Sequence, residues 1–399
     1  KIRGKDLPIL NLSSFDFLGL GQLEAVKVAS REALEFYGCG SCGPRGFYGT
    51  IDQHLKLEAA IANFMRTPEA ISYSDSASTV SSTIPAFAKR GDLLLVDEAC
   101  AEPIQTGLML SRGTVQTFRH NDMTHLHMML ESIAADDIRL KRDSLQQRRF
   151  IVVEGLYRNC GDLCPLPELI HLKEKFCYRL ILDESLSFGV IGSTGRGVTE
   201  HFGVSIDDVE MITVAMDTSL ASVGGLCIGS KEVVDHQRLS GTGYCYSAAA
   251  PPFMSAAALV SLAELQRDPS RLQRLHENTR RVADGISGIS GLLLTCGDAS
   301  SSTPVLHIRL KHALPSFEEE EEIMRRFSDY CIDHGIGVSC TNYQSSSSPW
   351  ILHQGMSKAG SSMPSSIRPS IRIIVTSLLS ASEISDIIRV LTAAATAII

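Results

Sequence analysis

The stretch MITVAMDTSLASVGGLCIG occupies residues 211–229 and shows the pattern that governs the fold. Its first five residues form a short apolar run, which predicts a buried strand. The polar residues that follow predict a short turn. The paired glycines Gly224 and Gly225 would then let two backbone segments approach closely, because neither residue carries a Cβ atom.

Similar apolar runs recur earlier in the chain, at residues 92–97, 150–154 and 179–183, and helical patterns such as residues 166–176 separate them. Strands that alternate with helices predict an α/β fold with a largely parallel sheet covered on both faces. In such sheets, functional groups gather beyond the carboxyl ends of the strands. Three of the four runs end near an acidic residue, so we expect the functional site at that edge.

The composition is that of a folded chain and argues against several classes of function. The chain has 399 residues, of which 44% are hydrophobic and 21% are charged, and its net charge is -8. Because no basic stripe is present, we expect no nucleic-acid partner. The eleven cysteines are scattered, which predicts a reducing compartment. Cys39 and Cys42 form a C-x-x-C motif without a second pair at zinc-finger spacing, so we predict no metal site.

A change in composition after Gly285 predicts a second lobe. We expect helices at residues 22–37, 52–66, 255–266, 270–288 and 316–334, and late strands at residues 291–295, 304–310, 337–340 and 370–375. The acidic run at residues 318–322 is expected to be a solvated first helical turn. Residues 241–263 carry no charge, but Pro251 and Pro252 favour a buried loop leading into a helix over a membrane span.

Several motifs occur in an order and at spacings that resemble one known family. They are NLSSFDFLGL (residues 11–20), GTIDQHLKLE (49–58), EGLYRNCGDLCPL (154–166), LDESLSFGVIGSTGRG (182–197), YCYSAAAPP (244–252) and IRI (371–373). This set resembles the α-oxoamine synthases, pyridoxal-phosphate (PLP) enzymes that join an amino acid to an acyl-CoA. The resemblance implies PLP-dependent transferase fold type I, with a mostly parallel seven-stranded sheet in a large domain and a smaller C-terminal α/β domain.

The resemblance breaks down at the residue on which the family's chemistry depends. The Schiff-base lysine of the family lies six residues before the first of the paired glycines, and counting back from Gly224 leads to Thr218. A hydroxyl cannot form an imine with the cofactor aldehyde or take the substrate α-proton as an amine can. We therefore predict that this chain alone is inactive.

Other cofactor contacts of the family are also replaced. The histidine that contacts the phenolic oxygen corresponds to Leu186, and the histidine that stacks on the pyridine ring corresponds to Ala101. The turn that holds the phosphate corresponds to residues 75–77, where the Asp75 carboxylate would repel a phosphate. Asp183 retains the position that pairs with the pyridinium nitrogen. We interpret Asp183 as vestigial or structural.

The motifs of the family's fold are retained, whereas its cofactor-binding residues are replaced, and this combination implies a non-catalytic subunit. Residues 40–50, 153–157 and 185–189 resemble such a subunit of one heteromeric family member. The resemblance implies a lysine-bearing partner subunit that holds PLP.

In that assembly, Cys42, Arg45 and Tyr48 would face the partner's substrate site, and Ser247 would reach the partner's PLP phosphate. Cys42 has a second interpretation as a small packing residue in a crowded turn. Arg372 corresponds to the family's substrate-carboxylate arginine, or forms an ordinary salt bridge.

The resemblance also gives expectations about domains and location. We expect an N-terminal arm and interface segment at residues 1–50, a large domain at 51–285 and a small domain at 286–399. The numbering begins at Lys1, so we expect upstream sequence that anchors the protein in the endoplasmic reticulum membrane, with its body facing the cytosol. Small regulatory subunits are possible partners.

Two other functions remain open. The chain would be an active homodimeric PLP enzyme if another lysine, such as Lys231, held the cofactor. It would be a purely regulatory scaffold if it contributed to no active site.

Overall fold

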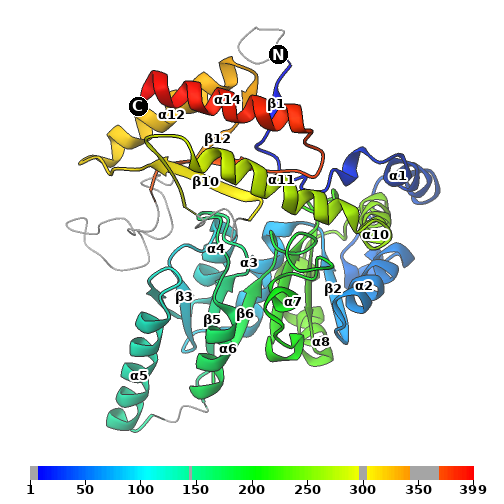
Figure 1. Ribbon diagram of the computed structural model, residues 1–399. Coiled ribbons are helices and arrows are strands. Elements are labelled where there is room, and N and C mark those ends of the chain that lie inside the picture. Colours follow the sequence, from blue (N-terminus) through cyan, green and yellow to red (C-terminus); the bar gives the residue numbers. More distant parts are fainter. Residues whose placement is uncertain (1–7, 143–145, 296–302, 342–367) are drawn as a thin grey trace. The chain divides into compact units, whose positions relative to one another are not determined.

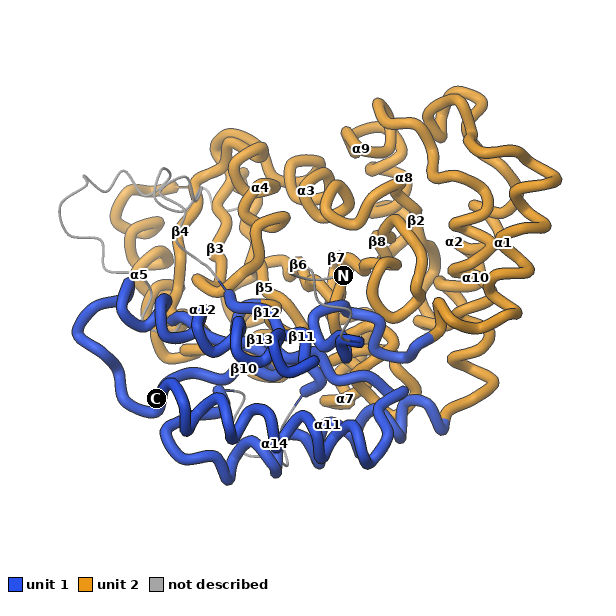
Figure 2. Tube along the Cα trace, turned by 90° about the horizontal axis from the view of Figure 1, so that it is seen from above, with its two compact units in different colours: residues 1–19, 159–162, 270–399 blue, residues 20–158, 163–269 orange. Residues whose placement is uncertain are grey.

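The computed structural model describes residues 8–142, 146–295, 303–341 and 368–399 (Figure 1). The chain forms two compact units, which Figure 2 shows in different colours. Unit 1 comprises residues 1–19, 159–162 and 270–399, and unit 2 comprises residues 20–158 and 163–269.

Unit 2 is built on a seven-stranded sheet with the order β2-β8-β7-β6-β5-β3-β4. Its strands are β2 (Glu69–Tyr73), β3 (Leu93–Asp97), β4 (Thr114–Phe118), β5 (Arg149–Glu154), β6 (Arg179–Asp183), β7 (Met211–Ala215) and β8 (Gly225–Gly229). Strand β8 runs antiparallel to both of its neighbours, β2 and β7, and the other pairings in this sheet are parallel. The predicted α/β fold with a mostly parallel seven-stranded sheet is confirmed.

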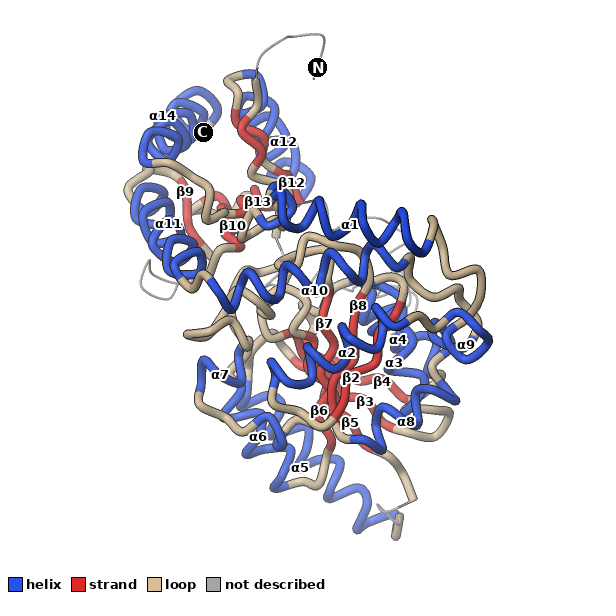
Figure 3. The backbone as a smooth tube through the Cα atoms, turned by 90° about the vertical axis from the view of Figure 1, so that its right-hand side faces the viewer, coloured by secondary structure: helices blue, strands red, loops and turns tan. Residues whose placement is uncertain are grey.

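Helices lie on both faces of this sheet (Figure 3). They are α1 (Glu24–Tyr37), α2 (Asp52–Met65), α3 (Ser76–Phe87), α4 (Glu102–Ser111), α5 (Met123–Leu140), α6 (Leu166–Lys175), α7 (Val198–Phe202), α8 (Lys231–Ser240), α9 (Thr242–Cys245) and α10 (Pro252–Arg267). Every residue of β3, β5 and β7 is buried, which explains why these strands read as continuous apolar runs rather than as alternating patterns.

The turn between β7 and β8 depends on the paired glycines. The Met216 amide donates to the Gly224 carbonyl at 2.8 Å, which closes the turn. Gly224 has a φ of +118°, a conformation that side-chain-bearing residues rarely adopt. A Cβ atom on Gly225 would lie 2.3 Å from Oγ1 of Thr79 on α3. The glycine pair therefore allows both the tight turn and the close packing of α3 on β8.

Unit 1 contains a four-stranded antiparallel sheet with the order β12-β13-β10-β9. Its strands are β9 (Leu292–Leu294), β10 (Val305–Leu310), β12 (Ser339–Thr341) and β13 (Ser370–Ile374). Its helices are α11 (Ser270–Ser287), α12 (Phe317–Asp333) and α14 (Ala381–Ile398). The predicted smaller C-terminal α/β domain is confirmed.

The division into units differs from the expected ranges at both ends of the large domain. The N-terminal segment belongs to unit 1, because β1 (Leu10–Asn11) pairs with β11 (Ile336–Gly337) and Leu12 is part of the unit 1 core. Helix α11 also belongs to unit 1, since Val282 and Ile286 enter the same core.

The acidic run at the start of α12 is not fully solvated. Glu320 is 3% exposed, and its carboxylate accepts hydrogen bonds from the Leu314 amide and pairs with Arg368. The rest of the first turn has the expected polar cap, with the Ser316 hydroxyl accepting from the Glu319 amide.

Residues 241–263 form a short helix, a loop and the start of α10, and Pro252 is the first residue of α10, as the prolines predict. Among the described residues, no helix combines the length and apolar character needed to cross a bilayer.

We expect the Gly225→Ala substitution to lower the free energy of unfolding by about 1–3 kcal/mol, because it overpacks the contact between β8 and α3. Gly40→Ala is the matched control, since no atom lies within 4 Å of a Cβ atom built there. Chemical denaturation of the two variants checks the expectation. Equal losses of stability would show that the close approach at Gly225 is unimportant.

Candidate functional site

Four consecutive strands of the unit 2 sheet end at one edge, where the sequence predicts the site. β3 ends at Asp97, β5 at Glu154, β6 at Asp183 and β7 at Ala215. The parallel pairing aligns these ends, and Glu154 lies directly opposite Asp183 in the register. The loops that follow the strands carry residues that the sequence predicts at the family's cofactor positions.

Thr218 lies in the turn after β7 and is only 5% exposed. Its hydroxyl is 3.0 Å from the carbonyl oxygen of Ser185, in the loop after β6, and 3.4 Å from that of Ala215. The side chain therefore joins two strand ends by a hydrogen bond to the backbone. At the position predicted to have lost the lysine, the hydroxyl has a structural contact.

Buried carboxylic acids gather at the same edge of the sheet. Burial raises the pKa of Asp183 to about 6, although hydrogen bonds from Ser185 oppose the shift. Burial, reinforced by the charge of Asp183, raises the pKa of Glu154 to about 8. Burial also raises the pKa of Glu184, the residue after Asp183, to about 7. Burial at this edge therefore raises all three carboxyl pKa values, and Glu154 is the one that these values keep mostly protonated at neutral pH.

Ala101 and Leu186 provide no polar side-chain contact for a cofactor ring. The Ala101 amide donates to the Glu154 carboxylate, and Leu186 is 5% exposed and part of the apolar core. Only Asp183 retains a side chain suited to a pyridinium nitrogen.

Two carboxylates lie at the turn predicted to correspond to the phosphate site: Asp75 is part of the turn, and Asp217, in the turn after β7, is hydrogen-bonded to it. Asp75 is the N-cap of α3, and its side chain accepts a hydrogen bond from the Ser78 amide at 2.9 Å. The Ser76 hydroxyl donates to the carboxylate of Asp217 at 3.1 Å. A helix N-terminus attracts anions, but here the Asp75 carboxylate already occupies that role. The residues of this chain therefore do not fit PLP at either the aldehyde end or the phosphate end.

The loops predicted to face a partner are hydrogen-bonded to one another within unit 2. The Ser41 hydroxyl donates to the Ala249 carbonyl at 2.8 Å, and the Ala249 amide donates to the Gly43 carbonyl at 2.9 Å. Ser247, in the second loop, is half-buried, and its hydroxyl lies 3.1 Å from that of Ser74.

The predicted interface residues of the first loop have different environments. Cys42 is exposed with a φ of 58°, so it is not a packing residue in a crowded turn. Tyr48 is fully exposed and has a φ of 63°.

Arg45, by contrast, lies in the interior of unit 2. Its guanidinium donates to both carboxylate oxygens of Glu58, at 2.7 and 3.0 Å, and to the Ser72 hydroxyl at 2.6 Å. It also lies over the ring of Tyr244, with 5.4 Å between its central carbon and the ring centroid. This position differs from the substrate-facing role predicted for Arg45. Its observed contacts hold the loop to α2 and β2.

Two other candidate residues lie away from the strand-end site. Lys231 is exposed at the first position of α8. Because β8 runs antiparallel to β7, its last residue Gly229 pairs with Met211, at the sheet edge opposite Thr218. In unit 1, Arg372 lies over the ring of Phe15, at 4.9 Å from the centroid.

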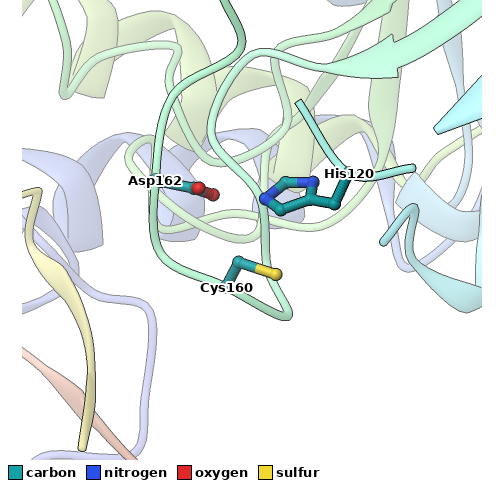
Figure 4. A group of neighbouring side chains, drawn as sticks. All are labelled: His120, Cys160 and Asp162. Atoms are coloured by element: carbon teal, nitrogen blue, oxygen red, sulfur yellow. The ribbon is translucent and has the colours of Figure 1, made fainter. Parts of the chain in front are cut away.

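Figure 4 shows three side chains with metal-binding chemistry, His120, Cys160 and Asp162. His120 belongs to unit 2, whereas Cys160 and Asp162 belong to unit 1. Within unit 2, Nδ1 of His120 is 2.9 Å from the Asp97 carboxylate, so the imidazole has a partner at the end of β3. The three residues define no metal site within either unit.

Sequence patterns missed three contributors to the site. Glu184 directly follows Asp183 and Asp217 directly precedes Thr218, and their signal was an acidic residue beside a strand end or a turn. Tyr246 is 84% exposed in the loop of Ser247, and no pattern in the sequence separates it from buried Tyr244.

The sheet, the smaller α/β unit and the strand-end loops together define the fold of PLP-dependent transferases. Residues 8–351 match the family model described as aminotransferase class I and II. The structure resembles a serine palmitoyltransferase from S. paucimobilis with a bound PLP–myriocin aldimine, with a TM-score of 0.84 and 23% identity over 99% of this chain and 89% of that one. It also resembles the 8-amino-7-oxononanoate synthase of Francisella tularensis, with a TM-score of 0.76 and 20% identity over 98% of each chain.

Comparison with curated relatives identifies the family within this class of transferases. Serine palmitoyltransferase 1 of Dictyostelium discoideum is 39% identical over 388 residues, which cover 96% of this chain and 76% of the relative. Long chain base biosynthesis protein 1 of Arabidopsis thaliana is 42% identical over 82% of this chain and 66% of the relative. Serine palmitoyltransferase 1 of Saccharomyces cerevisiae is 37% identical over 77% of this chain and 55% of the relative. The chain therefore belongs to the serine palmitoyltransferase 1 family, within aminotransferase class I and II.

We expect the buried acids to make stability depend on pH. Because their pKa values are raised in the folded state, the folded chain binds more protons than the unfolded chain between about pH 5 and pH 8, and stability falls as pH rises through this window. Glu154→Gln should remove on the order of 2 kcal/mol of that fall. Denaturation midpoints across the window measure it.

Glu102→Gln, at an exposed position of α4, is the matched control and should leave the pH dependence unchanged. A Glu154→Gln profile that runs parallel to the wild-type profile would show that Glu154 does not titrate in this range.

Proposed function

We propose that this chain is the non-catalytic subunit of a heteromeric serine palmitoyltransferase. The assembly would condense L-serine with palmitoyl-CoA, releasing CO2 and CoA and giving 3-ketosphinganine, in sphingolipid biosynthesis. The observation that carries the proposal is Thr218, whose buried hydroxyl bonds to the backbone at the position of the family's lysine. The carboxylates of Asp75 and Asp217 at the phosphate turn support it independently.

In this proposal the partner subunit supplies the lysine and holds PLP, which provides the electron sink for chemistry at the serine α-carbon when bound. This chain contributes no step through the cofactor. Its role is to position loops beside the partner's site and to stabilise the assembly.

The exposed aromatic side chains on the two joined loops favour a protein partner at this surface. Phe47 is 72% exposed, and Tyr48 and Tyr246 are exposed to a still greater extent. Aromatic residues are enriched at protein interfaces and often contribute most of the binding energy. The hydrogen bonds between Ser41, Gly43 and Ala249 hold the loops in place before the partner binds.

Ser247 would present its hydroxyl to the partner's PLP phosphate in exchange for its contact with Ser74.

We further propose that the assembly lies at the endoplasmic reticulum membrane, facing the cytosol. A segment outside this chain would anchor it, and small regulatory subunits would bind to it.

The purified chain alone, incubated with PLP, should give no saturable visible absorption band and no cofactor trapped by borohydride, because a hydroxyl at Thr218, the predicted lysine position, cannot form an imine. Absorption spectra and the mass of the reduced protein are the measurements. A band that saturates with PLP and disappears in Lys231→Ala would instead support an active homodimer that uses Lys231.

Ser247→Ala should weaken PLP retention by the heteromer about tenfold or more, since a hydrogen bond to a charged group contributes roughly 1.5–3 kcal/mol. Equilibrium dialysis of the purified heteromer with PLP, alongside a serine palmitoyltransferase assay, measures the loss. Ile138→Ala is the control, because Ile138 is 82% exposed on α5, away from these loops. Normal assembly with unchanged PLP retention and kinetics in Ser247→Ala would favour a purely regulatory scaffold.

A further inference from the structure

Cys39 and Cys42 are a pair of exposed thiols that the proposed function does not use for chemistry. They are separated by Gly40 and Ser41 and lie between the end of α1 and the turn of residues 45–49 that carries Tyr48. Both cysteines are free.

The loop is hydrogen-bonded at its flanks and at Ser41, and the space beside Gly40 is open. The Gly38 amide donates to the Leu34 carbonyl at 2.9 Å, which ties the start of the loop to α1. At the other side, Gly43 accepts from the Ala249 amide. Between these points, no atom lies within 4 Å of a Cβ atom built on Gly38 or Gly40, so there is space for the backbone to move.

The thiol of Cys42 contacts the backbone of the short segment that separates the two cysteines. Its Sγ atom lies 3.7 Å from the carbonyl oxygen of Gly40, the residue that follows Cys39. Cys42 also has a φ of 58°, in the left-handed region that non-glycine residues seldom adopt.

We propose that Cys39 and Cys42 form an intrachain disulfide by exchange with a small-molecule disulfide of the glutathione class. The thiolate of one cysteine attacks the small disulfide, forms a mixed disulfide and releases one small thiolate. The second cysteine then attacks the protein-bound sulfur, forms the intrachain bond and releases the second small thiolate. The two protein thiols are oxidised, one small disulfide is reduced to two thiols, and the two protein protons pass to solvent or to the released thiolates.

The disulfide has a consequence that rests on the proposed function. A ring closed between residues 39 and 42 constrains the segment just before Arg45 and Tyr48. It also removes the free Cys42 thiol from the surface proposed to face the partner. The Ser41 hydroxyl donates to the Ala249 carbonyl and the Gly43 carbonyl accepts from the Ala249 amide, and because both bonds lie in or beside this ring, closure also strains the link between the two interface loops. The oxidised chain should therefore bind the partner more weakly than the reduced chain.

Other cysteines of the described residues do not offer the same chemistry. Cys100, Cys160, Cys164, Cys227 and Cys331 are buried. Cys245 and Cys340 are half-buried, and neither has a second cysteine within three residues. Cys177 is exposed but has no second cysteine within three residues, so it can form only a mixed disulfide.

The first test is incubation of the purified full chain with oxidised glutathione, followed by peptide mass spectrometry and labelling of the remaining thiols with a maleimide. We expect a peptide with Cys39 bonded to Cys42 and the loss of both labels in the wild type. Cys39→Ser should instead carry glutathione on Cys42, and Cys177→Ser should form the intrachain bond as the wild type does. Glutathione on both cysteines of the wild type, or no reaction of either, would overturn the disulfide.

The second test measures binding of the reduced and oxidised chain to the lysine-bearing subunit by size-exclusion chromatography. We expect at least a tenfold loss of affinity on oxidation and recovery with a reducing agent. Cys39→Ser should lose no more affinity than a single glutathione causes. The double variant Cys39→Ser, Cys177→Ser measures that effect of one glutathione. Equal binding of the two wild-type forms, with the disulfide present, would overturn the coupling. Absence of binding even in the reduced form would count against the proposed function and leave the disulfide result standing.

Discussion

The reversal of the chain between β7 and β8 is the constraint on which the rest of unit 2 depends. Gly224 supplies the backbone conformation for the turn, and Gly225 lets α3 contact β8. Because β8 then runs back along β7, the one antiparallel strand joins β2 to the parallel part of the sheet. The same reversal places the turn of Thr218 at the edge with Asp183 and sends Lys231 to the opposite edge.

The sequence predicted the central strands of the unit 2 sheet better than its edge strands. Strands β3, β5, β6 and β7 are continuous apolar runs because helices cover both of their faces. The two edge strands, β2 and β4, were missed, since their sequences EAISY and TVQTF mix polar and apolar residues. Strand β4 is largely exposed or half-buried and needs few apolar side chains, so its pattern resembles that of a loop, whereas β2 is buried from Ala70 to Tyr73 but is interrupted by the polar Ser72.

The environment of charged residues could not be predicted from local pattern. Arg45 lies in a glycine-rich loop and Glu320 in an acidic run, and both contexts suggest solvent exposure. Each is buried because its partner, Glu58 or Arg368, is brought to it by the fold from elsewhere in the chain. A buried ion pair depends on geometry that only the folded chain defines. The prediction that Thr218 replaces the family's lysine, by contrast, needs only a residue type at a fixed spacing, so it could be made from the sequence alone.

The pairing of β1 with β11 has a consequence for the order in which the protein folds. Nearly all of unit 2 comes from one continuous part of the chain, whereas unit 1 joins residues 8–19 to strands and helices beyond residue 270. During synthesis on the ribosome, unit 2 can fold as soon as it has emerged, but Leu12 must wait for the last third of the chain before its core exists. Residues 8–19 are thus made before unit 2 but buried after it, and until then they are available to chaperones.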